Sequence, residues 1–184
     1  MGFCRSLRIF AAHVAAPKAN PDEIAFETMT HVLGGSFNSR INMNLREDKH
    51  WSYGAGTLVF DAAGPRPFMA YAPVQTDKTR ESMEEVAKEM RGIVGPVPVT
   101  EDELDRAKRA QTLRLPGAWE TAGRVAGSIS EIVRFGLPDD YFQTYPENVR
   151  ALRSPRTEVM QAQGMYLQLA TDMGQCRSTY TVFQ

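Results

Sequence analysis

The chain has 184 residues, of which 42% are hydrophobic and 23% charged, and its formal net charge is -1. This composition is typical of a globular domain, and a chain of this length buries enough surface to fold without a metal or a disulfide. The balanced charge disfavours binding to nucleic acid or to a membrane surface. No apolar run reaches the length of a membrane span and no leader pattern opens the chain. We therefore expect a soluble piece without a signal peptide, in a compartment that the sequence does not indicate.

The first part of the chain predicts a strand, a helix and a sharp corner. Residues Leu7 to Ala15 are apolar and small enough for a strand. The run Asn20-Pro21-Asp22-Glu23 offers an N-cap and a proline at the first helical position, so a helix should begin there. That helix should end at Gly34-Gly35, because glycine adopts the left-handed cap conformation without a steric clash. A second short helical stretch is predicted over Ser39 to Glu47.

The middle of the chain predicts a hairpin and a helix. The runs Tyr53 to Phe60 and Phe68 to Thr76 have strand character, and a turn-rich spacer separates them. They should pair as an antiparallel hairpin. From Asp77 the apolar period changes to that of a helix, which should close at Gly95.

Several helices are predicted in the remainder of the chain. Thr100 and Glu103 form a capping box, and the helix that they begin should stop at Pro116. The next helix has an apolar stripe and should end at Gly136; the stripe consists of Ala122, Val125, Ala126, Ile129, Ile132 and Val133. A broken helical stretch interrupted at Pro146 should follow. A last helix from Ser154-Pro155 and a short strand over Ser178 to Phe183 complete the prediction.

The order of these elements predicts an α+β fold, in which helices pack on one side of an antiparallel sheet. Residues 1–184 show no internal repeat and no convincing linker, so we expect a single domain.

Metal-binding and catalytic motifs are absent from the sequence. The three histidines do not stand four residues apart, and neither H-x-x-E-H nor H-E-x-x-H occurs. Glu47 and His50 could share a helical face, but a metal site would need further ligands. We therefore expect no metal and no other cofactor in this chain.

The segment Leu33 to Thr57, LGGSFNSRINMNLREDKHWSYGAGT, closely resembles the signature of the second, non-catalytic domain of insulinase/pitrilysin-like zinc peptidases. This family includes the subunits of mitochondrial processing peptidase. The segment has a helix ending in Leu-Gly-Gly, an Asn-Ser-Arg helix start, an Asn-Leu-Arg-Glu stretch and a Ser-Tyr-Gly entry to a strand. Later parts of the chain, the capping box and the Gly136-Leu137-Pro138 turn, also resemble the family.

The resemblance implies one half of a larger zinc metallopeptidase. In the family, two domains of similar fold close like a clamshell, and only the first carries the H-x-x-E-H motif. The second contributes an arginine and, seven residues later, a tyrosine that reach towards the substrate; Arg46 and Tyr53 stand at that spacing. The chain should be inactive alone. Its expected partners are a zinc-bearing domain, in cis or in trans, and a peptide substrate, with a homodimer as an alternative for the isolated chain.

Physical chemistry is consistent with these roles, but alternatives stay open. A guanidinium and a phenol are donors that can stabilise a carbonyl oxygen as it becomes an oxyanion. Alternatively, Arg46 pairs with a neighbouring acid, Tyr53 fills a strand position, and the chain is a purely structural subunit. A third alternative is an independent metal-dependent hydrolase that uses Glu47 and His50. One departure from the family is His50, which stands where a glycine is usual.

Overall fold

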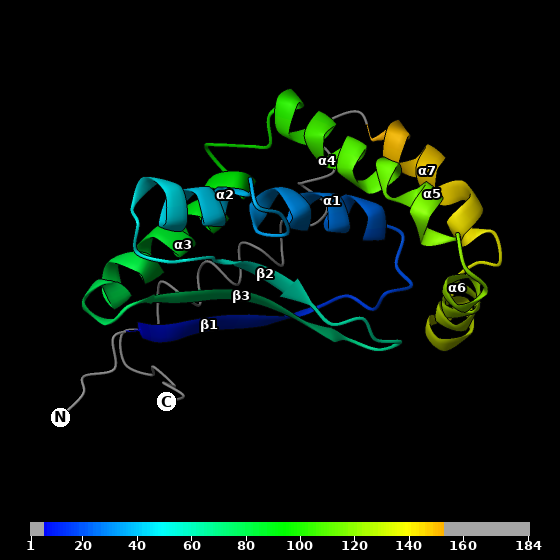
Figure 1. Ribbon diagram of the computed structural model, residues 1–184, viewed down its shortest axis with the longest axis horizontal. Helices are drawn as coiled ribbons and strands as arrows, with labels where there is room; N and C mark the ends of the chain where they lie inside the picture. Colours follow the sequence, from blue (N-terminus) through cyan, green and yellow to red (C-terminus); the bar gives the residue numbers. More distant parts are fainter. Residues whose placement is uncertain (1–5, 153–184) are drawn as a thin grey trace.

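A three-stranded antiparallel sheet with helices on one face is the frame of the molecule (Figure 1). The computed structural model describes residues 6–152. The elements are β1 (Ser6–Ala15), α1 (Glu23–Leu33), α2 (Arg40–Asn42), η1 (Met43–Asp48), β2 (Gly56–Val59), β3 (Arg66–Gln75), η2 (Thr76–Lys78), α3 (Thr79–Val94), α4 (Glu101–Leu113), α5 (Leu115–Ala118), α6 (Ala122–Phe135) and α7 (Tyr141–Ala151). The predicted α+β class is confirmed. The helix predicted from Ser154 and the strand predicted over Ser178 to Phe183 lie outside the described residues.

The predicted hairpin is present, but its first strand is shorter than expected. β3 lies between β1 and β2 and is antiparallel to both, with Phe10 and Gly56 opposite Tyr71. The strand predicted from Tyr53 begins only at Gly56. The residues before it form a loop, which meets the sheet through an isolated bridge between Ser52 and Val74.

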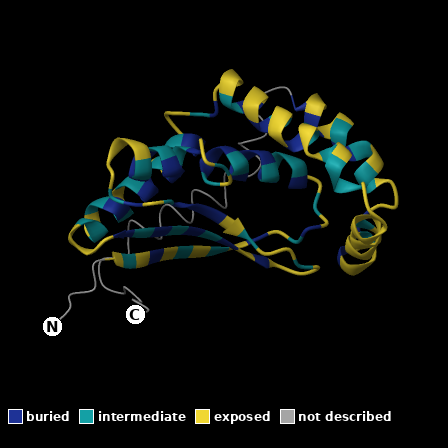
Figure 2. Ribbon diagram, in the orientation of Figure 1, coloured by how far each residue is buried: buried dark blue, intermediate teal, exposed yellow. Residues whose placement is uncertain are grey.

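The core lies between the sheet and the first layer of helices. α1 contacts β2, and α3 contacts β1 and β3. Leu33, Phe68 and Met90 come from these elements and are fully buried (Figure 2). Burying a side chain of this size stabilises the fold by about 1.5–3 kcal/mol. α4 covers α1, and α7 contacts both, so these two helices form a second layer farther from the sheet (Figure 1).

Gly34 ends α1 for a reason other than the predicted one. Its φ is -157°, which is extended backbone and not the left-handed cap conformation. A Cβ at this position would lie 2.5 Å from the Thr57 nitrogen, and the Gly34 carbonyl accepts a hydrogen bond from that nitrogen at 3.1 Å. The missing side chain therefore allows the end of α1 to touch the start of β2. At Gly136, where the next helix was predicted to end, α6 does end, and φ is 67°, which is the left-handed cap conformation.

Both prolines that should interrupt helices are tolerated. Pro116 does not terminate α4, which ends at Leu113; it lies in the first turn of α5, where no backbone N–H is needed. Pro146 lies inside α7, which continues through it. The predicted break there was wrong. The predicted capping box is confirmed, because Thr100 Oγ1 accepts from the Glu103 nitrogen and Glu103 Oε2 accepts from the Thr100 nitrogen.

Five charged side chains form a largely buried ion network at one end of the sheet: Lys18, Glu23, Glu27, Asp61 and Arg66. Lys18 Nζ lies 2.5 Å from Glu27, 3.2 Å from Glu23 and 3.3 Å from Asp61. Arg66 is only 1% exposed and pairs with Glu23 and Asp61. Burial alone would lower the pKa of Lys18, but the neighbouring carboxylates raise it above its usual value. The network joins the loop before α1, α1 itself and the β2–β3 hairpin.

Apolar side chains are exposed at several places among the described residues, and two of these places carry a group of them. One is the sheet, where Phe10, Val14 and Leu58 are exposed. The other is α6, whose predicted apolar stripe faces solvent at Ile129 and Val133. Within residues 6–152, no helix combines the length and hydropathy that crossing a membrane requires.

Candidate substrate-binding site

Arg46 lies in the π-helical turn η1, which continues α2 without a break. Its side chain is 40% exposed, and the guanidinium carbon lies 4.6 Å from the centre of the Phe37 ring. Arg46 Nε is 3.2 Å from Glu47 Oε1. The arginine is thus accessible, stacked on an aromatic ring and paired with its neighbour in the sequence. An ion pair between side chains this exposed is worth only about 0–1 kcal/mol, so Arg46 can exchange Glu47 for another anionic or carbonyl partner at little cost.

Tyr53 lies in the loop between η1 and β2 and is 98% exposed. The backbone around it is nevertheless held in place. Ser52 Oγ donates to the Pro73 carbonyl at 2.6 Å, and the Gly54 nitrogen donates to Ser52 Oγ at 3.1 Å. An aromatic side chain with this exposure adds nothing to the core of the chain, so its presence is not explained by folding.

Backbone hydrogen bonds bring the chain next to Tyr53 back to the turn that carries Arg46. The nitrogens of Trp51 and Ser52 both donate to the Leu45 carbonyl, at 2.9 and 3.2 Å. Arg46 follows Leu45 in the sequence, and Tyr53 follows Ser52. The Ser52–Leu45 hydrogen bond therefore joins the residues directly before the two candidates. The family resemblance implied a role for both residues, and these hydrogen bonds bring their backbones to one region.

His50 makes the tight return of this loop possible. Its φ is 57°, in the left-handed region that favours glycine, and its Nδ1 lies 3.0 Å from the Arg46 carbonyl. The histidine thus adopts a backbone conformation that favours glycine, at an expected cost of about 1 kcal/mol.

Three polar residues of the signature segment support this region: Arg40, Asn42 and Asn44. Asn42 Oδ1 accepts from the Ala55 nitrogen at 3.1 Å, and its Nδ2 donates to the Phe37 carbonyl at 2.6 Å. The first bond ties α2 to the residue just before β2, and the second ties it to the loop that precedes α2. Sequence reasoning did not single out Asn42 or Asn44, because a polar residue in a helix gives no local sign of a partner that is distant in the chain.

Asn44 and Arg40 anchor the same segment to other helices. Asn44 Nδ2 donates to Glu85 and to Glu89 on α3, at 2.8 and 2.7 Å, and this bond lowers the pKa of Glu85. Arg40 binds both carboxylate oxygens of Glu103 at the start of α4, at 2.7 and 2.6 Å. It also donates to the Val97 and Pro98 carbonyls. Arg40 is therefore structural, whereas Arg46 is partly exposed and pairs with its neighbour Glu47.

The alternative metal site at Glu47 and His50 gains no further ligand. Glu47 pairs with Arg46, and the His50 ring contacts the Arg46 carbonyl. In the described part of the chain, no group of three or more His, Cys, Asp and Glu side chains is arranged to hold a metal ion. The described residues therefore do not fit a zinc ion.

An antiparallel sheet covered by helices on one face is the frame of this chain, and the comparison with family models shows that it is a non-catalytic zinc-peptidase domain. The chain belongs to the family described as the peptidase M16 inactive domain, whose model matches residues 9–111. The narrower similarity to mitochondrial processing peptidase stays a prediction. No curated protein matches the chain.

Solved structures share this fold. The chain is 19% identical to a peptidase M16 inactive domain from Pseudomonas fluorescens, with a TM-score of 0.77, over 86% of this chain and 37% of that one. It is 18% identical to a candidate zinc protease from Bordetella pertussis, with a TM-score of 0.71, over 85% and 84% of the two chains. It is 15% identical to the inactive peptidase domain of a candidate zinc protease from Bordetella parapertussis, with a TM-score of 0.73, over 100% and 98%. The chain thus spans about two fifths of the Pseudomonas structure and most of the two Bordetella structures.

Proposed function

We propose that this chain is the inactive half of a zinc metallopeptidase and supplies Arg46 and Tyr53 to an active site shared with a zinc-bearing domain. The observation that carries the proposal is the setting of Tyr53. Its ring is 98% exposed, while the backbone beside it is hydrogen-bonded to the turn that carries Arg46. A fixed backbone with a free donor is suited to binding a group on another molecule.

Each residue has a distinct role in the proposal. The Arg46 guanidinium, released from Glu47, donates to a carbonyl of the bound peptide, and the Tyr53 hydroxyl donates to the scissile carbonyl as negative charge develops there. The zinc ion, which belongs to the partner domain, would activate water and polarise the same carbonyl. Because this chain offers donors but no zinc-binding group in its described part, it should not hydrolyse peptides alone.

The partner is a zinc-bearing domain, in the same polypeptide or in a second one. Membership of the inactive-domain family supports this, as does a Pseudomonas relative more than twice as long as this chain. The second candidate function is a purely structural subunit. The observation that favours it is the Arg46–Glu47 ion pair, which keeps the arginine occupied in the free chain.

The test is peptide hydrolysis by the chain alone and after mixing with a zinc-bearing M16 domain from the same genome. We expect activity only in the mixture. Arg46→Ala and Tyr53→Phe should each reduce kcat/KM of the mixture by about 10²-fold, the effect of removing one oxyanion donor. Arg109→Ala and Tyr71→Phe are the matched controls and should leave kcat/KM unchanged.

The two candidate functions give different results in this assay. If the mixture is active and neither Arg46→Ala nor Tyr53→Phe reduces the rate, the chain is a structural partner and the shared site is wrong. Hydrolysis by the chain alone, abolished by a chelator and by Glu47→Gln, would instead favour the independent hydrolase.

A further inference from the structure

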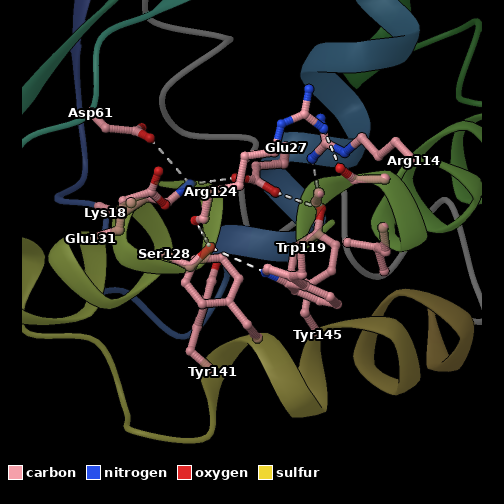
Figure 3. A pocket seen from close by; sticks show the side chains of 15 residues that line it. Lys18, Glu27, Asp61, Arg114, Trp119, Arg124, Ser128, Glu131, Tyr141 and Tyr145 are labelled. Atoms are coloured by element: carbon pink, nitrogen blue, oxygen red, sulfur yellow. Dashed lines mark hydrogen bonds and ion pairs between the residues drawn. The ribbon is translucent and has the colours of Figure 1, made fainter. Parts of the chain in front are cut away.

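A cavity of about 640 Å³ lies away from the site described above, where the loop before α1 meets the region from α5 to α7 (Figure 3). Neither Arg46 nor Tyr53 lines it. Its volume is in the range of small-molecule binding sites. Most of the residues that line it are aromatic or charged, so the lining can contact both an apolar group and a charged group of one ligand.

One wall of the cavity is an aromatic cluster. Trp119 and Phe142 have ring centres 6.2 Å apart, Phe142 and Tyr141 5.2 Å apart, and Tyr141 and Tyr145 6.0 Å apart. The Tyr141 hydroxyl is buried and has no hydrogen-bond partner. A buried hydroxyl without a partner costs free energy, which a ligand that hydrogen-bonds to it would recover. The wall thus combines apolar surface with an unsatisfied polar group.

Two guanidinium groups of the lining, Arg114 and Arg124, are bound only to neutral acceptors. Arg114 donates to the Tyr145 hydroxyl at 3.4 Å, and Arg124 donates to the Gly117 carbonyl. No ion pair of the described residues includes either arginine.

Three carboxylates also line the cavity, and two of them are paired with other cations. Glu27 and Asp61 are held by Lys18, and Asp61 also by Arg66. Glu131 is the lining acid for which the described residues provide no ion pair, and it is exposed. The lining is therefore balanced in formal charge, but Arg114 and Arg124 are the two lining cations without an ion pair among the described residues, and an anionic ligand would meet these two groups.

We propose that this cavity binds a carboxylate that carries an apolar or aromatic group, and that the carboxylate is the C-terminal end of a peptide. A guanidinium presents parallel donors that match the two oxygens of a carboxylate. The rings of Trp119 and Phe142 provide the surface on which an apolar side chain packs, and Tyr141 provides a further donor. The choice of a peptide as the source rests on the proposed function, whereas the recognition of a carboxylate rests on the cavity alone.

The test is direct binding to the 184-residue chain carrying Trp51→Phe, in which Trp119 is the remaining tryptophan and its fluorescence reports the cavity. The probes are acetyl-Ala-Ala-Phe with a free carboxylate and the same peptide with a C-terminal amide. We expect saturable binding of the acid in the millimolar range or below, and binding of the amide at least about tenfold weaker, as expected for loss of a charge-assisted hydrogen bond. Acetyl-Glu-Ala-amide tests whether an acidic side chain serves as well as a chain end.

Variants distinguish this site from a non-specific effect. Arg114→Gln, Arg124→Gln and Tyr141→Phe should each weaken binding of the acid and leave binding of the amide unchanged. Arg109→Gln, an exposed arginine on α4, is the matched control. Circular dichroism confirms that each variant is folded, and Arg114→Lys, which keeps the charge, should recover part of the affinity.

Three outcomes would overturn the proposal: equal binding of acid and amide, no saturation by either probe, or affinity for the acid that neither arginine variant lowers. Stronger binding of the acidic side chain would overturn the assignment to a peptide end. Arg46→Ala should leave all these affinities unchanged. A failure of the shared catalytic site in the hydrolysis assay would therefore not be confused with a failure of this cavity.

Discussion

Gly34 lies where the end of α1 touches the start of β2, and the contact is between two backbones. A Cβ there would meet Thr57 N at 2.5 Å and Gly56 C at 2.8 Å. Backbone atoms cannot rotate away as a flexible side chain can, so one extra carbon must push the helix and the strand apart. The same contact supports the loop that carries Tyr53, because that loop leads directly into β2.

We predict that Gly34→Ala lowers the free energy of unfolding by about 2 kcal/mol, a typical cost of overpacking, and lowers Tm by about 4–8 °C. The matched control is Gly64→Ala, where no atom lies within 4 Å of the added Cβ. Thermal unfolding followed by circular dichroism compares the two. Equal stability of the variants would show that α1 and β2 can separate without cost.

At the scale of elements, the Arg40–Glu103 pair fastens α2 to the start of α4. Glu103 also completes the capping box, so one carboxylate holds a helix end and an interhelical contact. Burial alone would raise the pKa of Glu103, but hydrogen bonds from Arg40 and Thr100 lower it below its usual value. A carboxyl with a lowered pKa stabilises the fold fully above its unfolded-state pKa, and the contribution is lost as the pH falls through the lowered value.

Glu103→Gln tests this contribution, because glutamine keeps the capping box while removing the charge. We predict that the variant is less stable than wild type by about 1–2 kcal/mol at pH 7, the value of a charge-assisted hydrogen bond. The difference should shrink as the pH falls below about 4.5. Urea unfolding at pH 7 and pH 3.5 measures it, with Glu101→Gln as control. A difference that does not change with pH would mean that the charge of Glu103 is not what stabilises the contact.

At the scale of the whole molecule, the buried ion network connects segments that are distant in the sequence. Arg66 and Glu23 are 43 positions apart and both almost fully buried. Their charges stabilise the fold only together, since either one alone would be a buried charge without a partner. Three members of the network, Lys18, Glu27 and Asp61, also line the proposed carboxylate cavity.

We predict that Arg66→Met costs about 3–5 kcal/mol, because it leaves Glu23 buried beside fewer cations. Combining it with Glu23→Leu should cost less than the sum of the two single changes. Chemical denaturation of both single variants and the double variant forms the double-mutant cycle. Additive losses would contradict the coupling inferred from the structure.

The sequence alone determined the features that depend on neighbours a few positions away. The capping box of α4, the end of α6 at Gly136 and the hairpin follow from hydrogen bonds and backbone preferences that are local. The resemblance of the signature segment pointed to the family and to Arg46 and Tyr53 as candidates. Their part in catalysis stays a prediction.

Only the tertiary structure decided which residues meet across long stretches of chain. It gave Gly34 its contact with Thr57, made Arg40 structural, buried Arg66 beside Glu23, and left Tyr53 exposed. The physical reason is that each of these outcomes depends on how the helices pack on the sheet, and side-chain packing between distant segments leaves no periodic pattern in the sequence.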